Sequence, residues 1–252
     1  MDPFPHKLGK LATRVDRRTL KLAKYLAGVL APAPTSRDWT GAIGQLGEMG
    51  NDRLGNCTCA AAGHLIQGWT GNATGTPIVL SDNDIVLAYE AVGGYNPADP
   101  STDNGCVELD VLNYWRNNGI GPASHKIAAY ASVNPKNFNE VMQAVDLFGG
   151  IYIGVGLPTS AQSQVGGLWD VTSASPGDIN SWGGHAIPIV GYTPNDLTCV
   201  TWGALQKMTW PWLLAYCDEA YALVTVDWIE ANGDSPSGFD IATLQADLAD
   251  LS

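Results

Sequence analysis

The spacing of apolar residues changes part-way along the chain, and this change constrains the fold more than any other feature. Residues 39 to about 145 contain segments with helical spacing, including 57–69, 85–89, 107–116 and 141–148. Residues from about 146 to 230 instead contain short β-branched and aromatic runs, at 151–155, 186–190, 197–202 and 220–226. A helical part followed by a strand-rich part is typical of an α+β protein.

The predicted helices have recognisable start and stop signals. Ser81 and Asp84 form a capping box before an apolar run. Later helices are expected to end at Gly119 and at Gly149, because glycine readily adopts the left-handed conformation that closes a helix. One more short helix is expected at about 240–251, at the end of a domain that spans 39–252.

The first 38 residues form an N-terminal arm with a distinct charge. The whole chain has 13 Lys and Arg against 25 Asp and Glu, a net charge of −12, yet seven of the basic residues precede Thr35. The leucines between 18 and 30 favour a short amphipathic helix, which Pro32 ends. The arm is either a solvated lead-in or a docking segment for its own body, a second copy or another protein. An activation segment is a third interpretation, although the arm is short for covering a cleft.

Composition excludes several classes of protein. A hydrophobic share of 45% supports a packed core, and an isoelectric point near 4.5 argues against a nucleic-acid partner. No apolar segment approaches the roughly 18 to 20 residues of a membrane helix, so no membrane association is expected. Five cysteines are too few and odd in number for a disulfide framework. We therefore expect a cytoplasmic protein, or a virion-associated one if a phage encodes it.

Two segments far apart in the chain carry the residue types of nucleophilic catalysis. Cys57 precedes an Ala-rich helix, and a thiol at a helix N-terminus lies in a field that favours the thiolate. His185 opens a predicted strand. Each residue alone has an ordinary structural interpretation, as a small core residue or as a hydrogen-bonded histidine. Together they match the nucleophile and base of acyl transfer.

The sequence around these residues resembles the papain-like cysteine peptidases, in the form found in divergent bacterial and viral members. The matching segments occur in consistent order between about 40 and 226, and comprise Leu54–Thr58, Asn118–Ile120, Gly184–Tyr192 and Trp202–Gly203. The resemblance implies a papain-like two-lobe fold. Its helical N-terminal lobe would span about 39–145 and its β-rich lobe about 146–230, with the cleft between them.

The resemblance also implies a role for individual residues. Cys57 would be the nucleophile and His185 the base that moves its proton. The main-chain amide of Cys57 and the side chain of Asn51, which replaces the family's glutamine on a shorter stem, would stabilise the oxyanion. Val200 stands where the family has the asparagine that orients the histidine, so this third member is lost. Trp202 would be an aromatic residue of the cleft.

Two other groups of side chains have less specific interpretations. Cys57, Cys59 and His64 lie close in sequence, but no second Cys/His pair follows at zinc-finger spacing, so neither a metal nor another cofactor is expected. Trp202 belongs to an aromatic group expected to pack the strand-rich part, one or two members of which could instead line a substrate site. Its members are Trp202, Trp210, Trp212, Tyr216 and Tyr221.

These observations predict a thiol hydrolase, a peptidase or isopeptidase acting on a peptide or protein through Cys57 and His185. An acyl or peptidyl transferase would use the same two residues. The alternative is a catalytically weak or inactive papain-like scaffold with a binding or structural role, for example in a phage or bacterial particle. The changes at Asn51 and Val200 and the basic arm favour the scaffold, whereas the intact Cys57 and His185 favour the enzyme.

Overall fold

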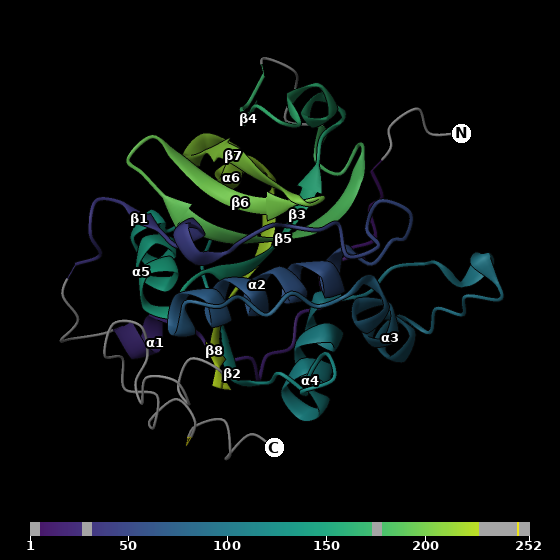
Figure 1. The fold of residues 1–252 in the computed structure, drawn as a ribbon. Coiled ribbons are helices and arrows are strands. Elements are labelled where there is room, and N and C mark those ends of the chain that lie inside the picture. The colour runs from purple at the N-terminus through teal and green to yellow at the C-terminus, as the bar shows by residue number, and fades with distance from the viewer. Residues whose placement is uncertain (1–5, 27–31, 173–177, 227–245, 247–252) are drawn as a thin grey trace.

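The computed structural model describes residues 6–26, 32–172, 178–226 and 246, and its centre is an eight-stranded sheet (Figure 1). The strands lie in the order β2-β8-β3-β5-β6-β7-β4, and β1 pairs with β5. Their bounds are β1 Arg37–Asp38, β2 Ile127–Ser132, β3 Ile151–Leu157, β4 Leu168–Trp169, β5 Gly183–Tyr192, β6 Asp196–Thr201, β7 Ala204–Thr209 and β8 Cys217–Thr225. Neighbouring strands are antiparallel except β4 and β7, which are parallel.

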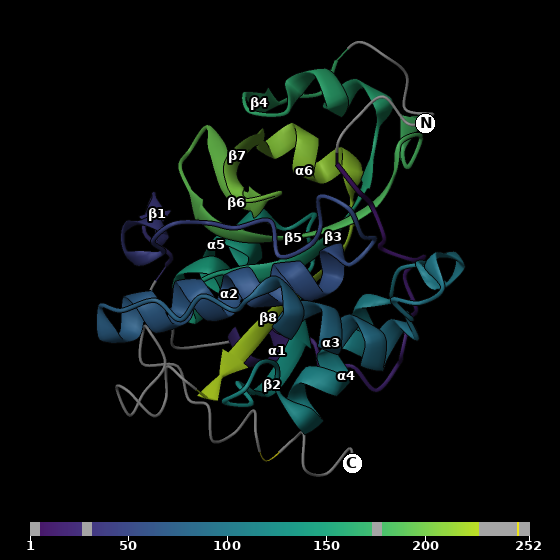
Figure 2. The same ribbon diagram turned by 45° about the vertical axis from the view of Figure 1, so that its right-hand side comes forward.

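Helices pack against both faces of the central strands (Figures 1 and 2). The long α2 (Cys57–Thr74) lies against β5, with α3 (Asp82–Gly93) and α4 (Glu108–Asn118) beside it. On the other face, α5 (Phe138–Phe148) and α6 (Trp210–Tyr216) contact β3 and β8. Alternate residues of β3 enter different cores, because side chains alternate along a strand: Ile151 and Ile153 face α5, and Tyr152 faces α2.

The predicted helix signals are confirmed. The Ser81 side chain accepts from the amide of Asp84, and the Asp84 carboxylate accepts from the amide of Ser81, which completes the capping box of α3. The helices α4 and α5 end at Gly119 and Gly149 as expected, and Gly149 has the left-handed φ of 68°. Local sequence therefore fixes the ends of these helices.

Other elements differ from the prediction. The part expected to be helical contains β2, whose alanine-rich sequence resembles a helix but pairs with β8. The strand-rich part contains the short helix α6, and β7 was not predicted. In each case, packing against distant elements decides the conformation rather than local preference.

The N-terminal arm is mostly extended and binds the body of its own chain. Of its expected helix, the described residues contain α1 (Ala23–Leu26), and 27–31 fall outside them. The helix expected at 240–251 also lies outside the described residues, apart from residue 246. Leu22 is fully buried, and its amide donates to the carbonyl of Ser132 at 2.9 Å. In the described part of the chain, no helix is both long and apolar enough to cross a membrane.

Candidate active site

Cys57 is the first residue of α2 and is almost completely buried, with 1% of its surface exposed. Its own amide lies in the first helical turn, where an N–H has no intrahelical acceptor. The packing of α2 on β5 brings the thiol to the main-chain amide of Ala186, the neighbour of His185. The fold therefore places the two predicted reactive residues at one seam, between the start of α2 and the strand β5.

His185 is held by two side chains at the end of β6, those of its last residue Thr201 and of the next residue, Trp202. Its Nε2 lies 2.7 Å from the hydroxyl oxygen of Thr201. The indole of Trp202 stacks on the imidazole, with 4.4 Å between ring centroids. The other nitrogen, Nδ1, is buried and has no hydrogen-bond partner among the described residues. Nδ1 is thus the ring nitrogen available to exchange a proton with a thiol.

Thr201 is the residue that sequence reasoning missed. Val200 packs with Ile43 and Val190 and does not share the surroundings of Trp202. In a regular strand residues 200 and 202 would share a face, but Trp202 has a left-handed φ of 44°, which ends the alternation of the strand. The Trp202–Gly203 pair, typical of a tight turn, was the sequence signal for this break.

The arm crosses the seam and forms hydrogen bonds with the helical side of the seam. The amide of Cys106 donates to the carbonyl of Gly9 at 2.9 Å, and the amide of Leu11 donates to the carbonyl of Cys106 at 2.9 Å. The main-chain amide of Gly9 also points to the sulfur of Cys57. This part of the arm therefore binds as one more extended peptide beside Cys106.

The same part of the arm bonds to the strand side. The amide of Lys10 donates to the carbonyl of Gly184 at 3.1 Å, one residue before His185. The carbonyl of Lys7 accepts from Trp202 Nε1 at 3.1 Å. Residues 7–11 thus lie between the two sides and are held by both. The arm covers the seam despite its expected shortness.

Glycines allow this close approach. A Cβ added to Gly9 would lie 1.8 Å from the carbonyl oxygen of Gly55, and one added to Gly184 would lie 2.2 Å from the carbonyl oxygen of Lys10. Both distances are far below van der Waals contact. The seam therefore accepts a peptide backbone at these points only where side chains are absent.

Burial keeps both reactive groups neutral in this arrangement. It raises the pKa of the Cys57 thiol to about 12, against the opposing effect of the Ala186 and Gly9 amides. Burial, with a smaller contribution from His6, lowers the pKa of His185 to about 3. At neutral pH the pair is therefore a thiol and a neutral imidazole rather than an ion pair.

Asn51 is buried and binds the arm. Its Nδ2 donates to the carbonyl of Leu54 at 2.9 Å and to that of Lys7 at 3.3 Å. It can therefore bind a peptide carbonyl in the seam, two residues along from the Gly9 amide that meets the thiol. Its role as an oxyanion donor stays a prediction.

The remaining candidates have structural surroundings. His64 Nε2 is 2.9 Å from the carbonyl oxygen of Gly47, and burial lowers the pKa of His64 to about 4. All five cysteines are free and buried. Across the described ranges, no three His, Cys, Asp or Glu side chains gather closely enough to hold a metal ion. Four of the five aromatic residues pack in the core of α5 and α6, and Tyr221 packs in the core of α2.

Solved structures that superpose on this chain include several cysteine proteases. Xylellain from Xylella fastidiosa superposes with a TM-score of 0.66 at 16% identity, covering 88% of this chain and 97% of that one. Procathepsin L 3 from Tenebrio molitor larval midgut gives 0.59 at 12% identity, covering 88% and 77%. The cysteine protease CMS1MS2 from Carica candamarcensis gives 0.54 at 16% identity, covering 76% and 98%.

The chain has the papain-like fold. No protein-family model and no curated protein sequence matches it. At 12–16% identity, the structural similarity shows a common fold and leaves the chemistry to be argued from the site. Within the papain-like fold, Cys57 and His185 occupy the helix start and the strand that the sequence resemblance predicts.

Proposed function

We propose that the protein is a papain-like thiol hydrolase of peptide or isopeptide bonds, and that the arm keeps it latent. The observation that carries the proposal is the arm itself. Residues 7–11 lie as an extended peptide across the seam, with the amide of Gly9 at the Cys57 sulfur and the amide of Lys10 on Gly184. A site that binds a peptide backbone against this thiol is suited to a peptide substrate.

The reaction follows from these positions. With the arm displaced, His185 takes the thiol proton, and the Cys57 sulfur attacks the substrate carbonyl carbon. The carbon–nitrogen bond breaks, His185 gives its proton to the leaving amine, and a thioester remains on Cys57. Water, deprotonated by His185, then attacks the thioester and releases the acid and the thiol. An amine in place of water would give acyl transfer, and product analysis with an added amine separates the two outcomes.

Three other groups support this chemistry. His185 Nε2 and the Thr201 hydroxyl share a hydrogen bond, and in the tautomer with the proton on Nε2 the hydroxyl accepts and Nδ1 is the proton acceptor. The Cys57 amide is a donor for the oxyanion, and Asn51 binds a carbonyl of the bound peptide. The hydroxyl of Thr201 replaces in function the amide that Val200 lacks.

The full-length Gly9→Ala variant tests the proposal. Its new Cβ cannot coexist with the Gly55 carbonyl at 1.8 Å, so the arm has to leave the seam. We expect iodoacetamide or a peptidyl epoxide to label Cys57 more than about tenfold faster than in the wild type, since one lost contact of 1.4 kcal/mol already gives that factor. Peptide hydrolysis should rise with the labelling rate and disappear in the Gly9→Ala, Cys57→Ser double variant.

A matched control is Gly41→Ala, whose added Cβ meets no atom within 4 Å. Cys57 in this variant should be labelled as slowly as in the wild type. If Cys57 in Gly9→Ala reacts no faster than the buried Cys199, the thiol is inert and the proposal is wrong. That result would favour the scaffold interpretation, in which the fold serves binding or assembly.

Two further expectations accompany this function. Free, buried thiols suit a reducing compartment such as the cytoplasm. Association with another protein through the arm stays a prediction, since its described residues bind their own body.

A further inference from the structure

The side chain of Lys10 enters a buried pocket lined by carboxylates. Only 2% of this side chain is exposed. Its Nζ lies 2.9 Å from a carboxylate oxygen of Asp218 and 2.9 Å from one of Glu219, both on β8. Glu108, the first residue of α4, supplies a third carboxyl group that acts on the lysine charge. These residues, with Gly154, define the lysine pocket.

Two of the carboxyl groups belong to the interior of the protein. Glu108 is completely buried, and neither of its carboxyl oxygens has a hydrogen-bond partner among the described residues. The hydroxyl of Tyr221 donates to Glu219 Oε2 at 2.8 Å, which fixes that carboxylate from the body of the domain. The acidic character of the pocket therefore remains when the arm is absent.

Gly154 on β3 makes the pocket deep enough for a long side chain. A Cβ at this position would lie 2.0 Å from Lys10 Cε and 2.7 Å from Glu108 Oε1. Any other residue here would occupy the space that the lysine stem now fills. The pocket thus has the length of a lysine side chain as well as the charge to bind it.

The ionised carboxylates of the pocket favour a cation. Burial disfavours the ammonium group, but Glu108, Glu219 and Asp218 together raise the pKa of Lys10 above its usual value. Burial and the nearby Glu219 raise the pKa of Glu108, and Lys10 opposes that rise. Removing the lysine would leave the buried Glu219 carboxylate without its counter-charge, which is costly in a protein interior.

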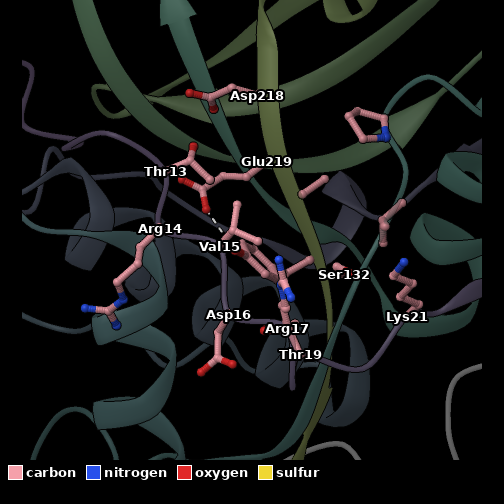
Figure 3. Close-up of a pocket in the computed structure, with 14 residues that line it drawn as sticks. Thr13, Arg14, Val15, Asp16, Arg17, Thr19, Lys21, Ser132, Asp218 and Glu219 are labelled. Atoms are coloured by element: carbon pink, nitrogen blue, oxygen red, sulfur yellow. Dashed lines mark hydrogen bonds between the residues drawn. The ribbon is translucent and has the colours of Figure 1, made fainter.

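A cavity along the path of the arm shares two residues, Asp218 and Glu219, with the lysine pocket. It has a volume of about 400 Å³ and lies between arm residues 13–21 and the strands β2 and β8. Asp218 and Glu219 line it beside Thr13 (Figure 3). Because the arm forms one of its walls, departure of the arm would open the acidic side chains to an incoming ligand.

We propose that the lysine pocket determines substrate specificity and selects a lysine or arginine side chain, with Lys10 as its resident occupant. This inference rests on the proposed hydrolase function. It follows from position, since Lys10 is the neighbour of Gly9, whose amide meets the Cys57 sulfur. A substrate side chain one residue from the point of attack would reach the same carboxylates. The substrate class is therefore a peptide or protein with a basic residue beside the cleaved bond.

Affinity labelling of full-length Gly9→Ala tests this assignment. The probes are peptidyl epoxides that differ only in having lysine or norleucine, placed at the first or second residue from the reactive carbon. We expect a lysine probe to label Cys57 about 10-fold to 100-fold faster than its norleucine match, because a buried charged hydrogen bond contributes about 1.5–3 kcal/mol. Rates are measured by mass spectrometry of the modified peptide.

Two pocket variants and one control sharpen the result. Glu219→Gln and Gly154→Ala, each added to Gly9→Ala, should reduce the lysine preference to less than about threefold. Gly154→Ala removes no charge, so it keeps the test available if Glu219→Gln does not fold. Asp196→Asn removes one carboxylate from an exposed pair with Lys207 and should leave the preference intact.

The possible failures are distinguishable. Equal labelling by lysine and norleucine probes, both faster than labelling of Cys199, would overturn the lysine pocket as a specificity site while the hydrolase proposal stands. A preference unchanged in both pocket variants would also overturn it. Labelling of Cys57 no faster than Cys199 by any probe would defeat the proposed function itself.

Discussion

Thr201 and His185 are 16 positions apart in the chain, and the hydrogen bond between them fixes one of the two imidazole nitrogens. A hydroxyl is a neutral partner that can rotate, whereas the stacked Trp202 restrains the plane of the ring. Orientation of the base is thus divided between a weak hydrogen bond and an aromatic contact. Loss of the hydroxyl should weaken the base without abolishing it.

We predict that Thr201→Val, measured with the arm displaced by Gly9→Ala, lowers the rate of Cys57 labelling about fivefold. The reason is that a buried neutral hydrogen bond contributes about 1 kcal/mol, and 1.4 kcal/mol is a factor of ten. The pH profile of labelling should shift as well. Val200→Ala, which alters only the cluster with Ile43 and Val190, should keep the rate within about threefold. An unchanged rate in Thr201→Val would show that Trp202 alone orients the ring.

Sequence could predict the candidate site only in part. Cys57 and His185 were predicted as candidates because each lies in a short motif near the start of an element, where local signals are strong. Thr201 was not placed, since the backbone reverses at Trp202 and the period of two no longer applies. Nothing local to Lys10 indicates that it meets Glu219, 209 positions later, because that pairing depends on the path of the whole arm.

At the scale of elements, α2 begins with Cys57 and also packs closely against its surroundings. A Cβ on Gly71 would lie 2.0 Å from the carbonyl oxygen of Ala42, whereas one on Gly68 would make only ordinary contacts, the nearest at 3.7 Å. The same substitution in one helix therefore has two different expected effects.

We expect Gly68→Ala to raise the free energy of unfolding by about 0.5–1 kcal/mol, because alanine loses less backbone entropy in a helix. Gly71→Ala should instead lower it by about 1–3 kcal/mol through overpacking. Urea denaturation followed by circular dichroism gives both values. Equal effects of the two substitutions would contradict the packing described for the end of α2.

Elements with end signals of their own were predictable, and those that depend on distant partners were not. The capping box of α3 and the glycine that ends α5 determine those helices locally. The strand β2 takes its conformation from β8 and from arm residues 20 and 22, to which Ser132 is hydrogen-bonded. No local pattern in its alanine-rich sequence carries that information.

At the scale of the whole molecule, the buried imidazole of His185 links folding to pH. Its pKa is lowered to about 3, against 6.5 for an exposed histidine. Between these two pH values the unfolded chain therefore binds a proton at His185 that the folded chain does not bind. Stability attributable to His185 is therefore complete above pH 6.5 and is lost as the pH falls from 6.5 towards 3. Glu108 has the opposite effect on the pH dependence of stability, because its pKa is raised on folding.

Comparison of the wild type with His185→Gln isolates this contribution, since Glu108 is common to both. We predict that the stability of the wild type relative to the variant decreases by about 1.4 kcal/mol for each pH unit below 6.5. Urea denaturation at pH 7, 6 and 5 measures the difference. A difference independent of pH would mean that His185 is solvated or already charged in the folded protein.

Residues 7–11 are covalently attached to the domain that they cover, so inhibition by the arm should not depend on the protein concentration. A blocking peptide supplied by a separate molecule would dissociate on dilution, but a tethered one faces its target at an effective concentration on the order of millimolar whatever the amount of protein present. Latency should thus be the same in a dilute extract and in a crowded cell. A competing ligand therefore has to bind the seam more strongly than an arm that remains attached to the domain.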